Sequence, residues 1–287
     1  MAQSRHIKRR ISTARNISKI TKAMEMVAAS KMRRAQDQAT AARPYAQALH
    51  SSLKKLAGRV DGSLHPLLSE HQTGQDVLVV IGTDKGLCGS LNAQLMKAAA
   101  QWHRQFPQGE VVAVGRKAVH FTRLLGAKLH AQFTDLPEQL RLSNIVPITT
   151  LVIDNFTQGK YRSVQLLYMD FINTLSQRVS QSQLLPLGEQ LPNFEQATMP
   201  QLAAEYMFEP DAAQVLSSIL PYYVENTVYQ AFLEARASEH SARMVTMKNA
   251  SENAGELVDE LQLMFNKSRQ QSITNELLDI TTSIMTV

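Results

Sequence analysis

Two stretches with helical periodicity occupy the ends of this chain and limit what it can fold into. The first runs from about Ser4 to Leu56 and the second from about Asp211 to Ile284. At about 1.5 Å of rise per residue they would extend roughly 80 and 110 Å, whereas an ordinary globular helix has roughly 11–12 residues. Helices of this length cannot fold back into a small core. We therefore expect them to bury their apolar stripes against each other or against another molecule.

Composition excludes several classes of protein. The 287 residues are 44% apolar but only 6% aromatic, which favours helices with thin seams over a large aromatic core. The single cysteine, Cys88, excludes an intramolecular disulfide and favours a reducing compartment. No apolar run approaches the roughly 20 residues that cross a bilayer, and no apolar signal segment opens the chain. The sequence thus predicts neither a transmembrane span nor a secretory signal.

Apolar residues at three-four spacing predict a coiled coil of the two terminal helices. The predicted N-terminal stripe contains Ile7, Ile11, Ala14, Ile17, Ile20, Met24, Val27, Met32, Ala35, Ala39, Ala42, Tyr45, Leu49, Leu53 and Leu56. The predicted C-terminal stripe contains Val215, Ile219, Tyr222, Phe232, Ala250, Ala254, Leu257, Leu261, Met264, Leu277, Ile280 and Ile284, with a slip in spacing after Met264. Two internal prolines, Pro44 and Pro221, predict a kink or a restart. Gly58 and the Asp61-Gly62 pair are expected to close the first helix.

The middle of the chain changes period and predicts an α/β domain. Residues 76–82 and 110–115 are continuous apolar runs typical of buried parallel strands. Helical stretches follow at 91–105, 116–125 and 144–157, and residues 163–171 and 177–187 fit a hairpin. This alternation favours a doubly wound, Rossmann-like sheet with an antiparallel edge.

The predicted fold is therefore of the α/β class: a long antiparallel coiled coil of the N- and C-terminal helices with an inserted Rossmann-like α/β domain. We expect a helix at 1–58, the α/β domain at 74–190, a polar connector near 188–210, and a second helix at 208–287. The second helix is longer by about 20 residues, so roughly 30 Å of it should extend past its partner. The apolar residues of that extension, among them Leu277, Leu278 and Ile280, would need an apolar socket on another molecule.

Charge is distributed unevenly along the chain. Ten Lys and Arg lie between Met1 and Arg34 and only Glu25 opposes them, whereas the last stretch carries acids such as Glu252 and Asp259. A basic and an acidic helix would attract each other. A basic helix can also bind nucleic acid, but no aromatic residue accompanies these cations before Tyr45, and a partner-facing flank of a coiled coil is the commoner meaning.

The turn from Gly82 to Asn92, GTDKGLCGSLN, follows a predicted strand and has the glycines of a phosphate loop. It contains neither GxxxxGK[ST] nor GxGxxG. Two interpretations are therefore possible: a phosphate-binding loop of a nucleotide-dependent enzyme, or a tight turn whose exposed residues contact a partner. The eight histidines include no pair at four-residue spacing, so a metal site is not expected. No cofactor is expected either. Three hypotheses stay open from the residues alone: an interaction subunit, a nucleotide-dependent enzyme, and a coiled-coil adaptor or nucleic-acid binder.

Three segments together resemble the γ subunit family of bacterial F-type ATP synthases. They are IKRRISTARNISKITKAMEMVAASKMRRAQ near the start, TDKGLCGSLN in the middle, and SEHSARMVTMKNASENAGELVDELQLMFNKSRQQSITNELLDI near the end. The resemblance covers essentially the whole chain, and the two terminal segments are the most specific part of it. Rotation is implied by this resemblance and not by periodicity or spacing.

The resemblance implies a central rotor shaft inside a ring of three α and three β subunits, one copy per complex, with no catalytic site of its own. Proton flow through a membrane c-ring would turn the shaft and drive ATP synthesis at the β subunits. The chain would be a peripheral subunit on the cytoplasmic side of a bacterial inner membrane. Its partners would be the α and β subunits, the ε subunit and the c-ring, and no nucleic acid.

Positions carried over from the family give the expected contacts. The β-facing residues would be Met24, Lys85, Gly86, Arg243, Arg269, Gln270, Thr274 and Glu276. The foot that meets the c-ring and ε would contain Tyr206, Phe208 and Glu209.

Overall fold

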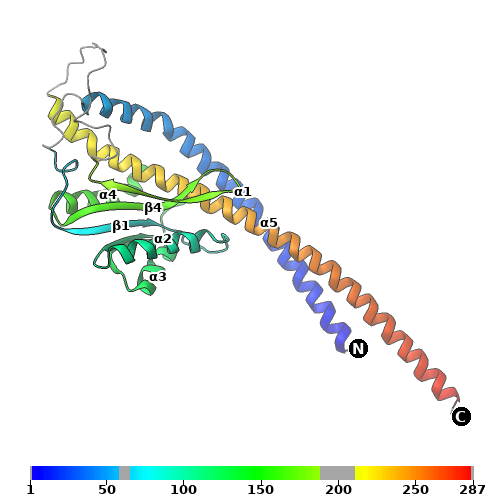
Figure 1. Ribbon diagram of the computed structural model, residues 1–287. Helices are drawn as coiled ribbons and strands as arrows, with labels where there is room; N and C mark the ends of the chain where they lie inside the picture. Colours follow the sequence, from blue (N-terminus) through cyan, green and yellow to red (C-terminus); the bar gives the residue numbers. More distant parts are fainter. Residues whose placement is uncertain (1, 58–64, 188–210, 286–287) are drawn as a thin grey trace. The chain divides into compact units, whose positions relative to one another are not determined.

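The computed structural model describes residues 2–57, 65–187 and 211–285. The chain divides into two compact units (Figure 1). The smaller unit combines Met1–Ser30 with Arg243–Val287, and the larger unit is Lys31–Ala242. In chain order the elements are α1 (Ala2–Ala57), β1 (Gln75–Ile81), α2 (Leu91–Gln105), β2 (Glu110–Val114), α3 (Arg116–Leu125), β3 (Lys128–Phe133), α4 (Leu142–Thr157), β4 (Tyr161–Phe171), β5 (Gln177–Leu185) and α5 (Ala212–Met285).

The larger unit is built on one five-stranded sheet with the order β3-β2-β1-β4-β5. The pairs β1–β2, β2–β3 and β1–β4 are parallel, and β5 pairs antiparallel with β4 at the edge. The chain proceeds from β1 to β2 and β3 on one side, and then crosses to β4 on the other. This is the doubly wound arrangement that the alternating periodicity predicts.

Helices cover both faces of the sheet (Figure 1). On one face, α2 and α3 pack around Leu78, Val80 and Trp102. On the other face, α4 and the first part of α5 pack around Val79 and Phe232. The central strand β1 is therefore buried from Val77 to Ile81. A strand enclosed in this way needs apolar side chains on both faces, which explains its unbroken apolar run.

The predicted helices and strands of the middle segment are confirmed, including the hairpin with its connection at 172–176, but the sequence analysis missed β3. This strand forms the parallel edge beside β2. Its sequence, KLHAQF, alternates between exposed and half-buried residues and contains no β-branched residue. Because an edge strand needs apolar residues on one side only, it lacks the continuous run that marks β1 and β2.

The two long helices have the predicted extents. The backbone N–H of Gln214 donates to Asp211 Oδ1 at 2.8 Å, so Asp211 caps α5 as expected. Both helices continue through their internal prolines, Pro44 and Pro221, so neither restarts there. The predicted stop at 58–62 and the predicted connector at 188–210 lie outside the described residues.

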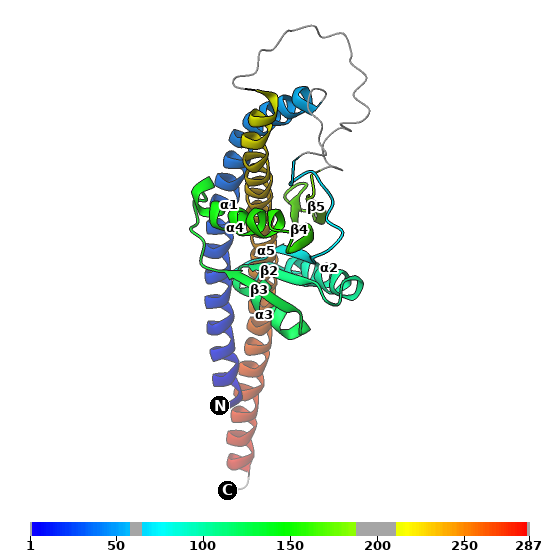
Figure 2. The ribbon, with the colours of Figure 1, turned by 90° about the vertical axis from the view of Figure 1, so that its left-hand side faces the viewer.

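In the smaller unit, the start of α1 and the end of α5 run side by side in opposite directions (Figures 1 and 2). The end of α5 continues beyond the start of α1, which is the predicted extension. Its apolar residues are exposed there: Ile273 by 49%, Leu277 by 60% and Ile280 by 58%.

Candidate functional site

The seam of the smaller unit follows a regular heptad pattern on both helices. On α1 the buried and half-buried positions recur at alternating spacings of four and three: Ile7, Ile11, Ala14, Ser18, Thr21, Glu25 and Ala28. On α5 the same spacing gives Met247, Ser251, Ala254, Val258, Leu261, Phe265, Ser268 and Ser272. Such a pattern keeps one face of each helix turned toward its partner.

This seam differs from the predicted one. Ile17, Ile20 and Val27 were expected inside but are 47%, 59% and 56% exposed, while Ser18 and Thr21 lie in the seam. On α5 the predicted slip in spacing after Met264 is also wrong, because Ser268 and Ser272 continue the heptads. A prediction that follows apolar residues leaves out small polar residues such as Ser18 and Thr21. It therefore assigns the neighbouring face of the helix to the seam.

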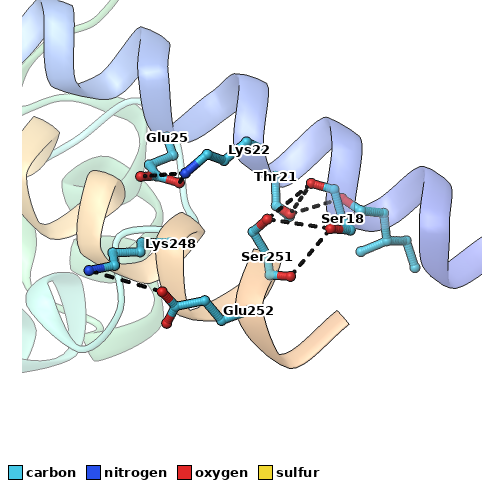
Figure 3. Close-up of polar contacts among 8 residues, drawn as sticks. Ser18, Thr21, Lys22, Glu25, Lys248, Ser251 and Glu252 are labelled. Carbon is cyan, nitrogen blue, oxygen red and sulfur yellow. Dashed lines mark hydrogen bonds and ion pairs between the residues drawn. The ribbon is translucent and has the colours of Figure 1, made fainter. Parts of the chain in front are cut away.

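At the centre of the seam, Ser18 and Ser251 point toward each other from the two helices (Figure 3). Ser18 Oγ donates to the Ser251 carbonyl oxygen at 3.3 Å, and Ser251 Oγ donates to the Ser18 carbonyl oxygen at 3.2 Å. On the same face of α1, the hydroxyl of Thr21 lies 2.9 Å from the carbonyl oxygen of Ile17. Small side chains and direct contact with main-chain oxygens bring the helices close together at this level.

Charged residues border this polar layer (Figure 3). Lys22 Nζ lies 3.0 Å from Glu25 Oε2, and Lys248 Nζ lies 4.0 Å from Glu252 Oε1. Each of these pairs joins residues of a single helix and has a largely exposed lysine, so it contributes little to stability. Between the helices, Arg15 Nη2 lies 3.5 Å from Gln262 Oε1, at the limit of a hydrogen bond.

The outer face of α1 carries the apolar residues that the seam leaves out. Ile17, Ile20 and Val27 are separated by three and seven residues, so they lie along one side of the helix. Half-buried Met24 falls on the same side. An exposed apolar stripe of this kind is typical of a surface that another molecule covers.

A second exposed feature is the loop between β1 and α2 in the larger unit. Thr83 is buried, and its hydroxyl lies 2.7 Å from the Lys85 carbonyl oxygen and 3.0 Å from Asn92 Oδ1. The backbone N–H of Arg116 donates to Asp84 Oδ1 at 2.9 Å. These bonds fix the base of the loop, so its tip is presented in a defined shape.

Leu87 forms part of this tip, and sequence reasoning did not single it out. Its φ of 61° is in the left-handed region and its side chain is 62% exposed. A leucine in this conformation is strained and, when exposed, gains little from burial in return. The available signal was an apolar residue beside the loop glycines of GLCG.

A small cavity lies at the carboxyl edge of the sheet, where Rossmann-like proteins bind nucleotides. It measures about 10 Å³ and is lined by residues that include Gly82, Gly115, Phe133, Phe232 and Arg236. That is the room of about one water molecule. The described residues also contain no group of three or more His, Cys, Asp or Glu able to hold a metal ion.

Comparisons with known proteins identify the family. A family model described as ATP synthase matches residues 3–287. An ATP synthase gamma chain from Mannheimia succiniciproducens is 40% identical over 284 residues, which cover 98% of each chain. Another from Dehalococcoides mccartyi is 42% identical over 285 residues, covering 98% of this chain and 97% of the relative. The chain belongs to the ATP synthase gamma chain family.

Solved structures share the fold of this gamma chain family member. The central stalk of the Tetrahymena thermophila mitochondrial ATP synthase matches with a TM-score of 0.62 and 28% identity, covering 81% of this chain and 99% of that one. The rotor of the Euglena gracilis mitochondrial ATP synthase matches with a TM-score of 0.67 and 18% identity, covering 95% and 99%. Among the described helices, none combines the length and the apolar character needed to cross a membrane.

The residues carried over from the gamma family lie in different surroundings. Lys85 is exposed and Gly86 half-buried in the loop after β1. Met24 is half-buried on α1, beside the outer stripe. Arg243, at the start of the smaller unit's part of α5, is 9% exposed, so most of its side chain is enclosed by this chain.

The remaining predicted contacts fall on the last turns of α5 or outside the described residues. Arg269, Gln270, Thr274 and Glu276 are all exposed. The Thr274 hydroxyl donates to the Gln270 carbonyl oxygen at 2.9 Å, a bond within the helix. The foot residues Tyr206, Phe208 and Glu209 lie outside the described part of the chain.

Proposed function

We propose that this gamma chain is the central rotor shaft of the F1 sector of a proton-translocating ATP synthase, and that its coiled coil stands inside a ring of three α and three β subunits. The observation that supports this most directly is the apolar stripe on the outer face of α1 in the smaller unit. Ile17, Ile20 and Val27 face outward, while the polar Ser18 and Ser251 lie within the seam. A coiled coil of this kind suits a surrounding sleeve with apolar patches.

The asymmetry of two helices supplies the mechanism. A single helix pair has no threefold symmetry, so at any moment it presents a different face to each β subunit. Each β site is then biased toward a different conformation and a different nucleotide affinity. A turn of the shaft by one third of a revolution exchanges these states among the three sites. Proton flow through the c-ring would drive the turn and lead to ATP synthesis and release.

The proposed β contacts are coupling contacts. Met24 beside the outer stripe, and Arg269, Gln270, Thr274 and Glu276 on the exposed end of α5, would meet the β subunits directly. Lys85 and Gly86 would do so from the loop after β1. Arg243 is largely enclosed, so we propose that it acts by holding its part of α5 in place or through its small exposed portion.

The other proposed partners are the ε subunit and the c-ring, which would bind at the foot formed by Tyr206, Phe208 and Glu209. One copy of the chain would serve each complex, as a peripheral subunit on the cytoplasmic side of a bacterial inner membrane. The chain would carry no catalytic site, because catalysis would belong to the β subunits. It would also bind no nucleic acid and no cofactor. In this proposal the shaft consists of the helices at 1–58 and 208–287, and the α/β domain occupies 74–190.

Affinity purification from native membranes tests the proposal. A tag inserted at the exposed turn of Pro107 and Gln108 avoids the coiled coil and the loop after β1. After nuclease treatment, the purified material should show Mg-dependent ATPase activity and contain α, β and ε, with about three β per tagged chain. Recovery of the chain alone, or with nucleic acid and no ATPase activity, would contradict the rotor function.

A further inference from the structure

Residues 134–141, which connect β3 to α4, contact both long helices of the larger unit. We call this segment the strap. It starts at the edge of the sheet and is held to α1, α3 and α5 by side chains from each of them. All of these contacts lie inside Lys31–Ala242.

On the α5 side, three side chains contact the strap. Tyr229 Oη donates to the Leu140 carbonyl oxygen at 3.2 Å, and Arg236 Nη2 donates to the Leu136 carbonyl oxygen at 3.3 Å. His240 Nε2 lies 3.5 Å from Glu138 Oε1. The three residues are separated by seven and four positions, so they lie on one side of the helix. This side of α5 is thus matched to the main chain and the Glu138 carboxylate of the strap.

On the α1 side, the contact is made by Lys31, the first residue of the larger unit. Its Nζ lies 2.5 Å from Glu138 Oε2. One carboxylate therefore holds α1 by one oxygen and α5 by the other. Burial alone would raise the pKa of Glu138, but the hydrogen bond and charge of Lys31, with the charges of His240 and Arg236, hold it below its ordinary value. Glu138 is accordingly ionised at neutral pH.

The strap is also fixed to the sheet. Leu140 is 3% exposed and belongs to the core between the sheet, α4 and α5, and Leu136 packs against the same core. Asp135 forms an ion pair with Arg116 of α3 at 3.1 Å. The strap can therefore transmit a displacement of the α/β domain to whatever Glu138 holds.

We propose that Glu138 is a positioning residue that locks α1 and α5 to the α/β domain, so that torque applied to this domain reaches both helices together. This inference rests on the proposed rotor function and adds to it the place where the domain holds the shaft. Glu138 is expected to act through the two helices that it contacts.

The exposure of the pair separates this role from a role in folding. The side chain of Lys31 is 31% exposed and that of Glu138 is 49% exposed. Ion pairs this accessible to water contribute little to overall stability. Loss of Glu138 should therefore leave the chain folded while loosening the connection between the domain and α1.

Charge exchange in the assembled complex tests the inference. Glu138→Lys, Lys31→Glu and the double variant would be compared in inverted membrane vesicles, with ATP hydrolysis and ATP-driven proton pumping measured on the same sample. We expect each single variant to lower the protons pumped per ATP by roughly two- to fivefold, with hydrolysis within about twofold of the parent. The double variant should recover at least half of the lost coupling.

Gln139→Lys is the matched control, because Gln139 is exposed on the same strap and its replacement introduces a lysine one residue away from Glu138. It should couple like the parent. Glu138→Gln, which keeps the shape of the side chain, carries the test if Glu138→Lys fails to assemble, and it should reduce coupling in the same direction. Parental coupling in both Glu138 variants, or an equal loss in Gln139→Lys, would overturn the role of Glu138. A parent chain that forms no ATPase complex would instead contradict the rotor function itself.

Discussion

Ser18 and Ser251 exchange hydrogen bonds across the seam of the smaller unit, each hydroxyl donating to the other residue's carbonyl oxygen at 3.3 and 3.2 Å. The two hydroxyl oxygens lie 3.5 Å apart. This reciprocity requires one alignment of the helices, because a shift by one turn would separate both pairs. A polar residue at a seam position commonly specifies register at a cost in stability. The Ser18–Ser251 pair has the position and the bonding to serve in this way.

Removal of either hydroxyl should cost about 0.5–1.5 kcal/mol of stability. Because the two bonds belong to one layer, Ser18→Ala and Ser251→Ala should be non-additive, with a coupling energy of about 0.5 kcal/mol or more. Urea unfolding of the full chain, followed by circular dichroism at 222 nm, measures both quantities. The unfolding transition reported by the fluorescence of Trp102 should be the same as in the parent, because Trp102 lies in the core of the larger unit. The control is Ser12→Ala on the exposed side of α1; strict additivity would remove the basis for a register role.

The polar layer also shows why periodicity predicted the helices well but their contact faces poorly. Helix length and direction follow from a long amphipathic pattern, which survives errors of one residue. The seam depends on the exact face, and Ser18 and Thr21 could be placed there only by knowing what α5 presents opposite them. The sequence favoured Ile17 and Ile20 because apolar residues usually occupy seams. Here those residues are exposed in the single chain. The pattern of one helix does not tell whether an apolar face packs on the other helix or on another molecule.

Similar reasons explain the other differences. β3 was missed because an edge strand is encoded by weak alternation, whereas β1 was found because burial on both faces demands an apolar run. The strap could not be predicted, since the contact of Glu138 with Lys31 and His240 joins residues far apart in the chain. Leu87 is similar: its left-handed φ follows from how the whole loop is held, and leucine itself gives no sign of it.

The outer stripe should matter for assembly and not for the stability of the isolated chain. Ile17 and Ile20 are about half exposed, so replacing both by serine should change the free energy of unfolding by only about 0.5 kcal/mol. If a partner buries them, the same change should weaken binding to a reconstituted α/β ring by tenfold or more. Chemical denaturation and a binding titration measure the two effects.

Ile11→Ser is the comparison variant for the outer stripe, because it removes an apolar side chain that is buried within the chain. Ile11 is 6% exposed in the seam, so its replacement should cost about 2–5 kcal/mol in the isolated chain. A loss of stability in the Ile17/Ile20 double variant as large as that in Ile11→Ser would show that the stripe is buried within the chain. Unchanged ring binding would show that no partner covers it.

Glu110 should make the larger unit less stable in acid. Its carboxylate, 7% exposed, lies 2.5 Å from Lys128 Nζ and 2.7 Å from His130 Nδ1. Burial alone would raise its pKa, but these hydrogen bonds and charges hold the pKa below the ordinary value of 4.5. A carboxyl group with a depressed folded pKa stabilises the fold above its unfolded pKa, and this contribution is lost as pH falls through the folded pKa.

Glu110→Gln should therefore cost about 1–2 kcal/mol near pH 6, and the difference from the parent should shrink steadily below about pH 4.5. Trp102 lies in the core of the same unit, so its fluorescence during urea unfolding reports this effect. Glu70→Gln is the control, because Glu70 is exposed. A difference that stays constant from pH 6 to pH 3 would show that the Glu110 charge contributes nothing to folding.

Replacement of two exposed leucines by glycine should have opposite effects on stability. Leu87 is 62% exposed at a φ of 61°, where leucine carries about 1–2 kcal/mol of strain that glycine lacks. Leu124 is 74% exposed within α3, where glycine costs about 1 kcal/mol. Leu87→Gly should thus leave the unfolding free energy of the isolated chain unchanged or raise it by about 1 kcal/mol, while Leu124→Gly lowers it.

A strained residue is retained where its side chain serves a contact, so Leu87→Gly should reduce proton pumping per ATP in the assembled complex. Equal destabilisation by the two variants in urea unfolding would show that Leu87 is not strained, and unchanged coupling would remove its role at the partner surface.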